Sequence, residues 1–178
     1  MELTKFHEMC MAYGKAQQDF QTFETDCHIF SVELVKKFRE YLEIPDSQFS
    51  LYKIDKNNEF VIVPPSLINA MSPAAGTYWQ FGIGITVCSA PETMPQDLIL
   101  IHILIRKDLE NKFYAKFGPG QKELEIDRKN ENGFNEFFTF LHQTVVSSYQ
   151  TEFQKFIGHN TFRKLGFKFH AETENNKD

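Results

Sequence analysis

The spacing of hydrophobic residues predicts helices at both ends of the chain. Between Leu3 and Phe20 the apolar residues recur at steps of three and four, as on one face of an amphipathic helix. A polar break at residues 24–26 follows, and a second helix is expected to run to Glu43, just before Pro45. We expect these two helices to form a hairpin that covers a sheet.

A third helical pattern starts near Asn132 and reaches about Ile157. Gly158 is a suitable stop, because a glycine just past a helix adopts the left-handed conformation without steric cost. One face of this helix should pack on the sheet. We expect residues 1–170 to form a single domain and the polar residues 171–178 to be a disordered tail.

The middle of the chain has the patterns of β-strands. Residues 78–87 alternate between the two faces of a strand, whereas residues 98–106 are apolar on both faces, which is typical of a covered central strand. Residues 66–77 are rich in small residues and proline, and we expect a long surface loop there. The strand-like runs are 51–55, 59–63, 78–87, 98–106, 112–117 and 122–126.

These patterns together predict the fold class. We expect a single-domain α+β fold with an N-terminal helical hairpin, a central, mainly antiparallel sheet of about five to six strands, and a long C-terminal helix packed on that sheet. The sequence contains 19 Phe and one Trp, which indicates a large aromatic core. The net charge of -5 argues against nucleic acid as a partner, because phosphate binding needs clustered Lys and Arg.

Cysteine usage and the apolar runs bear on the compartment. Cys10, Cys27 and Cys88 are an odd number without close spacing, which favours free thiols in a reducing compartment. The start of the chain lacks the pattern of a secretory signal, and the apolar run 98–105 is far shorter than the roughly 20 residues that a membrane span needs. We therefore expect a cytoplasmic protein that does not associate with membranes.

Two histidines and two cysteines near the start of the chain have the residue types of a zinc site. His7 and Cys10 on one helix and Cys27 and His28 on the next are suitable zinc ligands, but a tight hairpin would hold the two pairs far apart. We expect no bound metal and no cofactor, with Cys10 in the core.

An alternative function uses Asp97, Glu110 and Lys112. An acidic residue followed later by Glu-x-Lys resembles the arrangement in restriction-type nucleases, in which two acidic groups hold a divalent metal and the lysine orients water. This resemblance implies a small metal-dependent nuclease or hydrolase with these three catalytic residues. A chance match in a surface turn is the better explanation of the pattern, and the acidic net charge also argues against a nuclease.

A second alternative is a carrier of an apolar small ligand. His102 interrupts an apolar strand, and Gly82 and Gly84 on a neighbouring strand would leave room beside it for a ligand. Close packing of a helix on the two glycines is the competing explanation, with His102 as a hydrogen-bonded core residue.

The main functional hypothesis is a non-enzymatic accessory or regulatory protein, similar in role to a chaperone, an immunity protein or an adaptor. It follows from the lack of a catalytic motif and from the predicted loop that ends at Tyr78 and Trp79, since large aromatic residues are frequent interface anchors. The expected binding residues are Tyr78, Trp79 and His102, and the expected partner is another protein or a second copy of the chain.

Overall fold

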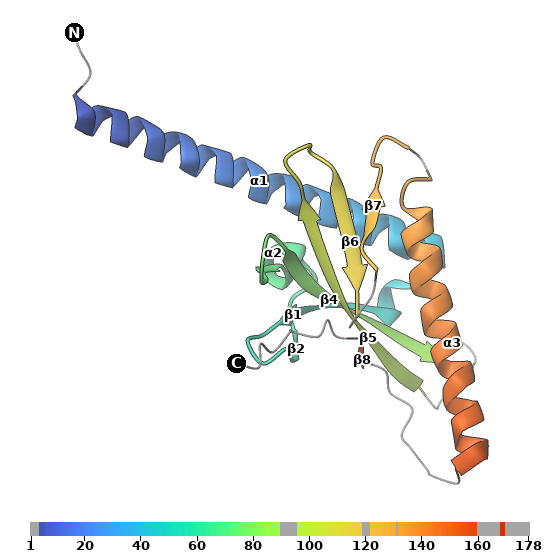
Figure 1. The fold of residues 1–178 in the computed structure, drawn as a ribbon. Coiled ribbons are helices and arrows are strands. Elements are labelled where there is room, and N and C mark those ends of the chain that lie inside the picture. Colours follow the sequence, from blue (N-terminus) through green and yellow to red (C-terminus); the bar gives the residue numbers. More distant parts are fainter. Residues whose placement is uncertain (1–3, 90–95, 119–121, 131, 160–167, 170–178) are drawn as a thin grey trace.

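The computed structural model confirms an α+β fold in which two long helices pack against one antiparallel sheet (Figure 1). It describes residues 4–89, 96–118, 122–130, 132–159 and 168–169, with side chains described up to residue 151. The expected tail 171–178 lies outside the described residues, and so does most of the segment after the last long helix. Among the described helices, none is both long and apolar enough to cross a membrane.

Helix α1 (Lys5–Leu42) is one continuous helix of 38 residues, so the predicted helical hairpin is wrong. Residues 24–26 are polar but include no Pro or Gly, and the Thr25 hydroxyl donates a hydrogen bond to the Gln21 carbonyl one turn earlier. A polar turn that faces solvent does not end a helix unless its backbone is forced out of helical geometry. The helix begins at the Thr4 cap and ends at Glu43, which has a left-handed backbone with φ of 52°.

Six strands follow each other through the main sheet in the order β2-β1-β4-β5-β6-β7. Their bounds agree with the predicted runs to within two residues: β1 (Phe49–Ile54), β2 (Phe60–Ile62), β4 (Trp79–Cys88), β5 (Gln96–Lys107), β6 (Phe113–Phe117) and β7 (Leu124–Ile126). All neighbours along this path are antiparallel. Strand β8 (Lys168–Phe169) pairs parallel with β5, on the β5 edge that β6 also uses.

The segment 66–77 is not the structureless loop that its composition predicts. It contains the short helix α2 (Leu67–Ala70) and strand β3 (Ser72–Pro73), which pairs with the start of β4. Leu67 and Ala70 lie one turn apart and are both buried. Their contact with the core gives this segment the fixed structure that its small residues do not suggest. The short 3-10 helix η1 (Asp46–Gln48) joins α1 to β1.

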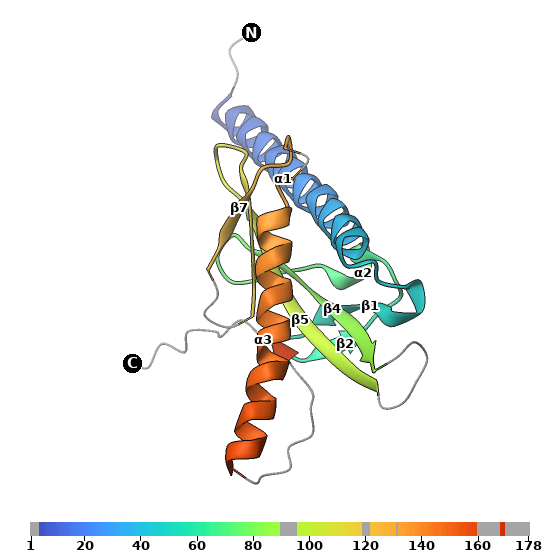
Figure 2. The same ribbon diagram turned by 90° about the vertical axis from the view of Figure 1, so that its right-hand side faces the viewer.

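Helix α3 (Asn135–His159) begins beside α1 and runs along the sheet (Figure 2). Its phenylalanines meet those of α1 and the sheet in one cluster, as the Phe content predicts. Phe30 of α1 stacks on Phe113 of β6 with ring centroids 4.4 Å apart and on Phe134 at 5.9 Å, and Phe38 lies 5.4 Å from Phe138. The cluster fixes both helices to the same face of the sheet.

Strand β5 is buried on both faces from Ile99 to Ile105, which confirms the predicted central strand. On the face away from the helices, Gly82 and Gly84 of β4 lie under aromatic side chains from β1 and β2. A Cβ at Gly82 would lie 2.6 Å from the Phe60 ring, and one at Gly84 would lie 2.5 Å from the Tyr52 ring. Aromatic rings of neighbouring strands, and not a helix, therefore explain the two glycines.

The variant Gly84→Val tests this packing. Its side chain would have to displace the Tyr52 ring, and we expect the free energy of unfolding to fall by about 2 kcal/mol or more, as is usual for overpacked cores. Urea denaturation measures the loss. Gly14→Ala is the control, because a Cβ at Gly14 meets no atom within 4 Å. Equal stability of wild type and Gly84→Val would show that the ring does not occupy this space.

Candidate functional site

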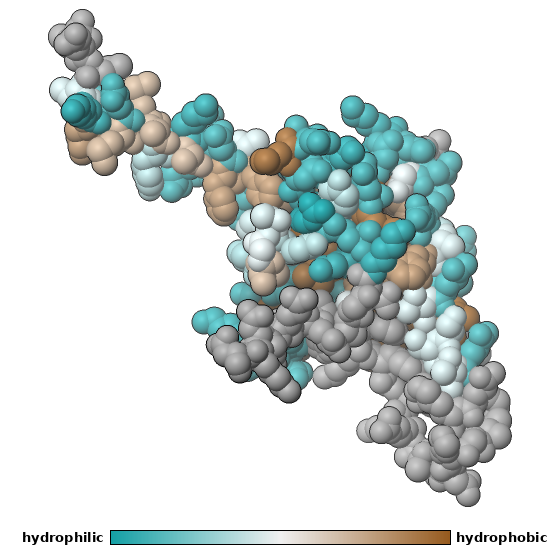
Figure 3. Space-filling view, viewed as in Figure 1, coloured by the Kyte–Doolittle hydropathy of each residue, from teal (hydrophilic) through white to brown (hydrophobic). Residues whose placement is uncertain are grey.

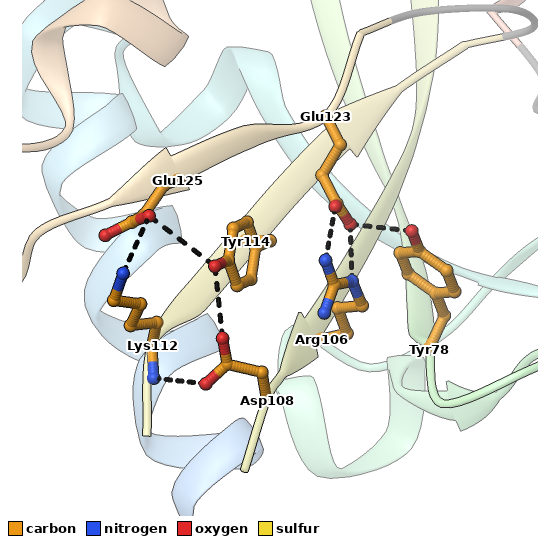
Figure 4. Close-up of polar contacts among 7 residues, drawn as sticks. All are labelled: Tyr78, Arg106, Asp108, Lys112, Tyr114, Glu123 and Glu125. Carbon is orange, nitrogen blue, oxygen red and sulfur yellow. Dashed lines mark hydrogen bonds and ion pairs between the residues drawn. The ribbon is translucent and has the colours of Figure 1, made fainter. Parts of the chain in front are cut away.

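A polar cluster covers one end of the sheet, where β5, β6 and β7 meet the start of β4 (Figure 4). Glu123, just before β7, accepts hydrogen bonds from Arg106 Nε at 2.7 Å, from Arg106 Nη2 at 2.5 Å and from Tyr78 Oη at 2.6 Å. The Arg106 guanidinium also lies over the Tyr114 ring at 4.1 Å, and the Lys116 amine lies over the Tyr78 ring at 4.4 Å. This bidentate pair ties β5 to the segment that precedes β7.

A second group of side chains continues the cluster toward the β5–β6 turn. Tyr114 Oη donates to Asp108 at 3.1 Å and contacts Glu125 at 3.5 Å, while Lys112 lies 3.5 Å from Glu125 (Figure 4). Lys112 also lies 3.7 Å from Glu110. Asp108 also accepts from the backbone N–H groups of Glu110 and Lys112. Each carboxylate here has a partner of opposite charge or a hydrogen-bond donor.

The protonation states of the cluster favour a structural role. Burial alone would raise the pKa of Glu123, but the hydrogen bonds and charges of Arg106 and the hydrogen bond from Tyr78 outweigh it and lower that pKa. Burial, followed by the bond to Glu123, raises the pKa of Tyr78. Both shifts lead away from neutral pH, so Glu123 is an ionised acceptor and Tyr78 a protonated donor there, whereas acid–base catalysis is most effective with a pKa near the working pH.

The structure does not bring together the predicted nuclease residues. Asp97 lies at the start of β5, whereas Glu110 lies in the turn past its other end, roughly 30 Å away at about 3.3 Å per strand residue. Asp97 accepts a hydrogen bond of 2.8 Å from Tyr149 of α3, which locks that helix to the strand. Lys112 is close to Glu110 but far from Asp97.

The cysteine and histidine residues considered as zinc ligands also lie far apart. Because α1 is continuous, Cys10 and Cys27 are separated by about 25 Å of helix. Cys10 is exposed, contrary to the expected core position. The described part of the chain contains no group of three or more His, Cys, Asp or Glu side chains that is suited to hold a metal ion.

Trp79 and His102 are core residues. Trp79 begins β4 with 8% of its surface exposed, so it does not lie on an exposed loop as an anchor. His102 is 2% exposed, its Nε2 lies 3.0 Å from Gln80 Oε1, and its ring meets the edge of Phe60 at a centroid distance of 6.5 Å. Tyr78 is half-buried and belongs to the polar cluster, so the three expected binding residues do not form one exposed surface.

Among the described residues, several exposed large hydrophobic side chains gather on the first half of α1, which projects away from the sheet (Figure 1). Phe6, Met9 and Tyr13 are 72%, 69% and 68% exposed, and Phe20 is 58% exposed. Figure 3 shows apolar side chains along this projection beside hydrophilic ones. We define the α1 stripe as the residues that line one side of this part of the helix: Phe6, Met9, Tyr13, Ala16, Phe20 and Phe23.

The α1 stripe is the continuation of the buried face of the same helix. Its residues alternate at steps of three and four, and the same alternation goes on through Cys27, Phe30 and Leu34, which are fully buried against the sheet. A seven-residue repeat of this kind is the pattern of helices that pack side by side. The sequence carries this signal, and the assumed break at residues 24–26 concealed it.

A groove of about 800 Å³ lies between the second half of α1, strand β1 and helix α2. Val32, Leu51 and Ile68 supply apolar walls, and Lys36 and Glu40 bring charges of both signs to its rim. Its helical residues lie on the side of α1 away from the phenylalanine cluster. The groove is therefore a separate surface from the α1 stripe.

Thiol labelling tests the burial of α1 along its length. Cys10 is exposed, whereas Cys27 is fully buried, and burial raises the pKa of its thiol to about 11. Because the thiolate is the reactive form, we expect iodoacetamide at pH 7.5 to alkylate Cys10 at least about 100-fold faster than Cys27 in the folded protein. Peptide mass spectrometry measures both rates. Rapid labelling of Cys27 without denaturant would contradict the buried position.

The variant Glu123→Gln tests the polar cluster through its pH dependence. Because the pKa of Glu123 is lower in the folded than in the unfolded chain, its stabilisation is complete above the ordinary pKa of 4.5 and is lost as the pH falls through the folded value. We expect the free energy of unfolding of wild type to exceed that of the variant by about 1–2 kcal/mol at pH 7, and this difference to shrink as the pH falls below 4.5. Urea denaturation across this range gives the difference. A constant difference would rule out the ionic contribution.

Comparison with known proteins does not identify a relative. No protein-family model, no curated protein and no solved structure matches the chain. The function is therefore argued from the geometry of the chain itself.

Proposed function

We propose that this protein is a non-enzymatic accessory or regulatory protein that binds another polypeptide through the α1 stripe. The observation that carries the proposal is a helix with one continuous apolar side, of which the sheet covers only the second half. The uncovered half of this side holds Phe6, Met9, Tyr13 and Phe20, and Phe23 is half-buried where the helix meets the core. Aromatic and methionine side chains are enriched at protein interfaces, where they act as anchors.

The energetics favour a helical partner for this surface. Each Phe or Tyr side chain buries about 150–250 Å² when fully packed, and apolar burial contributes about 25 cal/mol per Å². The three exposed aromatic residues of the stripe, Phe6, Tyr13 and Phe20, therefore forgo several kcal/mol of burial free energy while they face water. A second amphipathic helix covers such a stripe with side-by-side packing, which is a common mode of protein recognition.

The rigid attachment of α1 also supports a binding role. The second half of the helix is fixed by the phenylalanine cluster, and Lys107 of β5 bonds Asp26 at 2.5 Å at the point where the helix leaves the body. The projecting half is thus held in a defined direction before a partner arrives. A surface that is ordered in advance loses less conformational entropy on binding.

The two alternative functions have less support. A metal-dependent nuclease requires Asp97 and Glu110 at one metal, but they lie at opposite ends of β5. A carrier of an apolar ligand requires space beside Gly82 and Gly84, where the rings of Phe60 and Tyr52 lie.

Affinity capture with matched variants tests the proposed function. The tagged full-length chain is expressed in its source cells together with an untagged copy, and the co-purifying polypeptides are quantified. We expect wild type to retain a polypeptide in stoichiometric amount. Phe20→Glu should retain at least tenfold less of it, because a carboxylate would be buried in the apolar interface. Met11→Glu is the control, since Met11 is 61% exposed but lies outside the stripe.

The capture experiment has two outcomes against the proposal. Retention that is equal for wild type and Phe20→Glu would show that the stripe is not the binding surface. If wild type retains neither a foreign polypeptide nor the untagged copy, the proposed binding function is wrong.

A further inference from the structure

We infer that the occupant of the α1 stripe is the α1 stripe of a second copy, so that two projecting helices pair in antiparallel orientation. This inference rests on the proposed function and names its partner. A dimer with twofold symmetry presents the same patch from both copies, so the patch has to be complementary to itself. The order of residues in the α1 stripe meets this condition.

When the stripe is paired with a second copy that runs in the opposite direction, each of its residues lies opposite an apolar residue. In antiparallel pairing Phe6 of one copy lies opposite Phe23 of the other, Met9 lies opposite Phe20, and Tyr13 lies opposite Ala16. The twofold axis then repeats these three contacts in the other half of the interface, which gives six apolar layers. The bulky Tyr13 faces the small Ala16, so that large and small side chains interdigitate as close packing requires.

Parallel pairing fits the stripe less well. It would place Tyr13 against Tyr13 and Ala16 against Ala16, which crowds one layer and leaves a void in another. It would also set Asp19 beside Glu24 of the other copy on both sides, and like charges across such helices repel each other. The two sheets would emerge at the same end of the pair, side by side.

The charges that flank the stripe are compatible with antiparallel pairing. Lys5 of one copy faces the other copy's Asp26, which already bonds Lys107 of its own chain, and Asp19 faces the neutral Ala12. Cys10 faces Gln17 on the opposite side of the seam. No two like charges meet across the antiparallel interface, whereas the parallel one contains two such meetings.

The length of the bare helix also fits a second copy. The layers run from Phe6 to Phe23 and end just before Cys27, the first fully buried residue of α1. The six layers therefore fill the projecting length, about 27 Å, and end at Phe23, where α1 meets the core. If each of the six exposed aromatic rings in the two copies covers roughly 100 Å², these rings alone bury about 600 Å². With Met9, the exposed part of Phe23 and the flanking side-chain stems, the total reaches the roughly 1,000 Å² of a specific interface.

Sedimentation equilibrium of the purified full-length chain tests the pairing. We expect wild type to have twice the mass of the 20.8 kDa chain at tens of micromolar. Met9→Glu should raise the dissociation constant at least about 100-fold, because it occurs twice in each dimer and buries each carboxylate against Phe20 of the other copy. Met11→Glu adds the same charge on the other side of the helix and should leave the dimer intact. Both sites are exposed, and circular dichroism checks that each variant folds.

The orientation is measured separately with a spin label at Lys5→Cys in a Cys10→Ser/Cys88→Ser background. Antiparallel helices place the two labels about 30 Å apart along the axis, whereas parallel helices place them side by side. Double electron–electron resonance distinguishes these distances. A short distance would overturn the antiparallel arrangement.

The remaining outcomes separate this inference from the proposed function. A wild-type monomer at 100 micromolar, or a dimer that persists in Met9→Glu, would overturn self-pairing through the stripe. The proposed function is judged by the capture experiment, in which a foreign polypeptide that is lost in Phe20→Glu would support it even if the chain is monomeric.

Discussion

The stack of Phe30 on Phe113 and Phe134 is the contact on which the rest of the structure depends. It joins α1, strand β6 and the residue just before α3 in one place, with ring centroids 4.4 Å and 5.9 Å from Phe30. Aromatic contacts of this kind add about 0.5–1.5 kcal/mol each beyond their burial. Because the stack holds the second half of α1 on the sheet, it also sets the direction in which the first half leaves it.

Because of this attachment, the two halves of α1 share one apolar repeat, but the second half is buried and the first half is exposed to solvent. Cys27, Phe30 and Leu34 are buried by the sheet, whereas Phe6, Tyr13 and Phe20 continue the same side of the helix into solvent. An exposed stripe of this length costs free energy in the isolated chain, and the energy is recovered when a partner helix covers it. The physical basis of the proposed binding is thus a helix that is longer than the body it packs on.

The polar cluster stabilises the sheet at a place separate from the α1 stripe. Arg106, Glu123 and Tyr78 satisfy each other with short hydrogen bonds and hold the strands at one end of the sheet. Their pKa shifts keep Glu123 ionised and Tyr78 protonated, which strengthens the network and leaves neither group free for proton transfer. The aromatic rings of Tyr52 and Phe60 close the other face of the sheet over Gly82 and Gly84.

Alternation, helical spacing and phenylalanine content are local properties of the chain, so the strands, the last long helix and the aromatic nature of the core were readable from the sequence, although α3 continues through the expected stop at Gly158 to His159. The predicted strand 98–106 already separated Asp97 from Glu110. The burial of Trp79 and the continuation of α1 through residues 24–26 were not readable in this way, because they depend on which elements cover which residues. The apolar repeat of α1 was readable from the sequence, but its two halves were distinguishable only once the sheet had covered one and left the other bare.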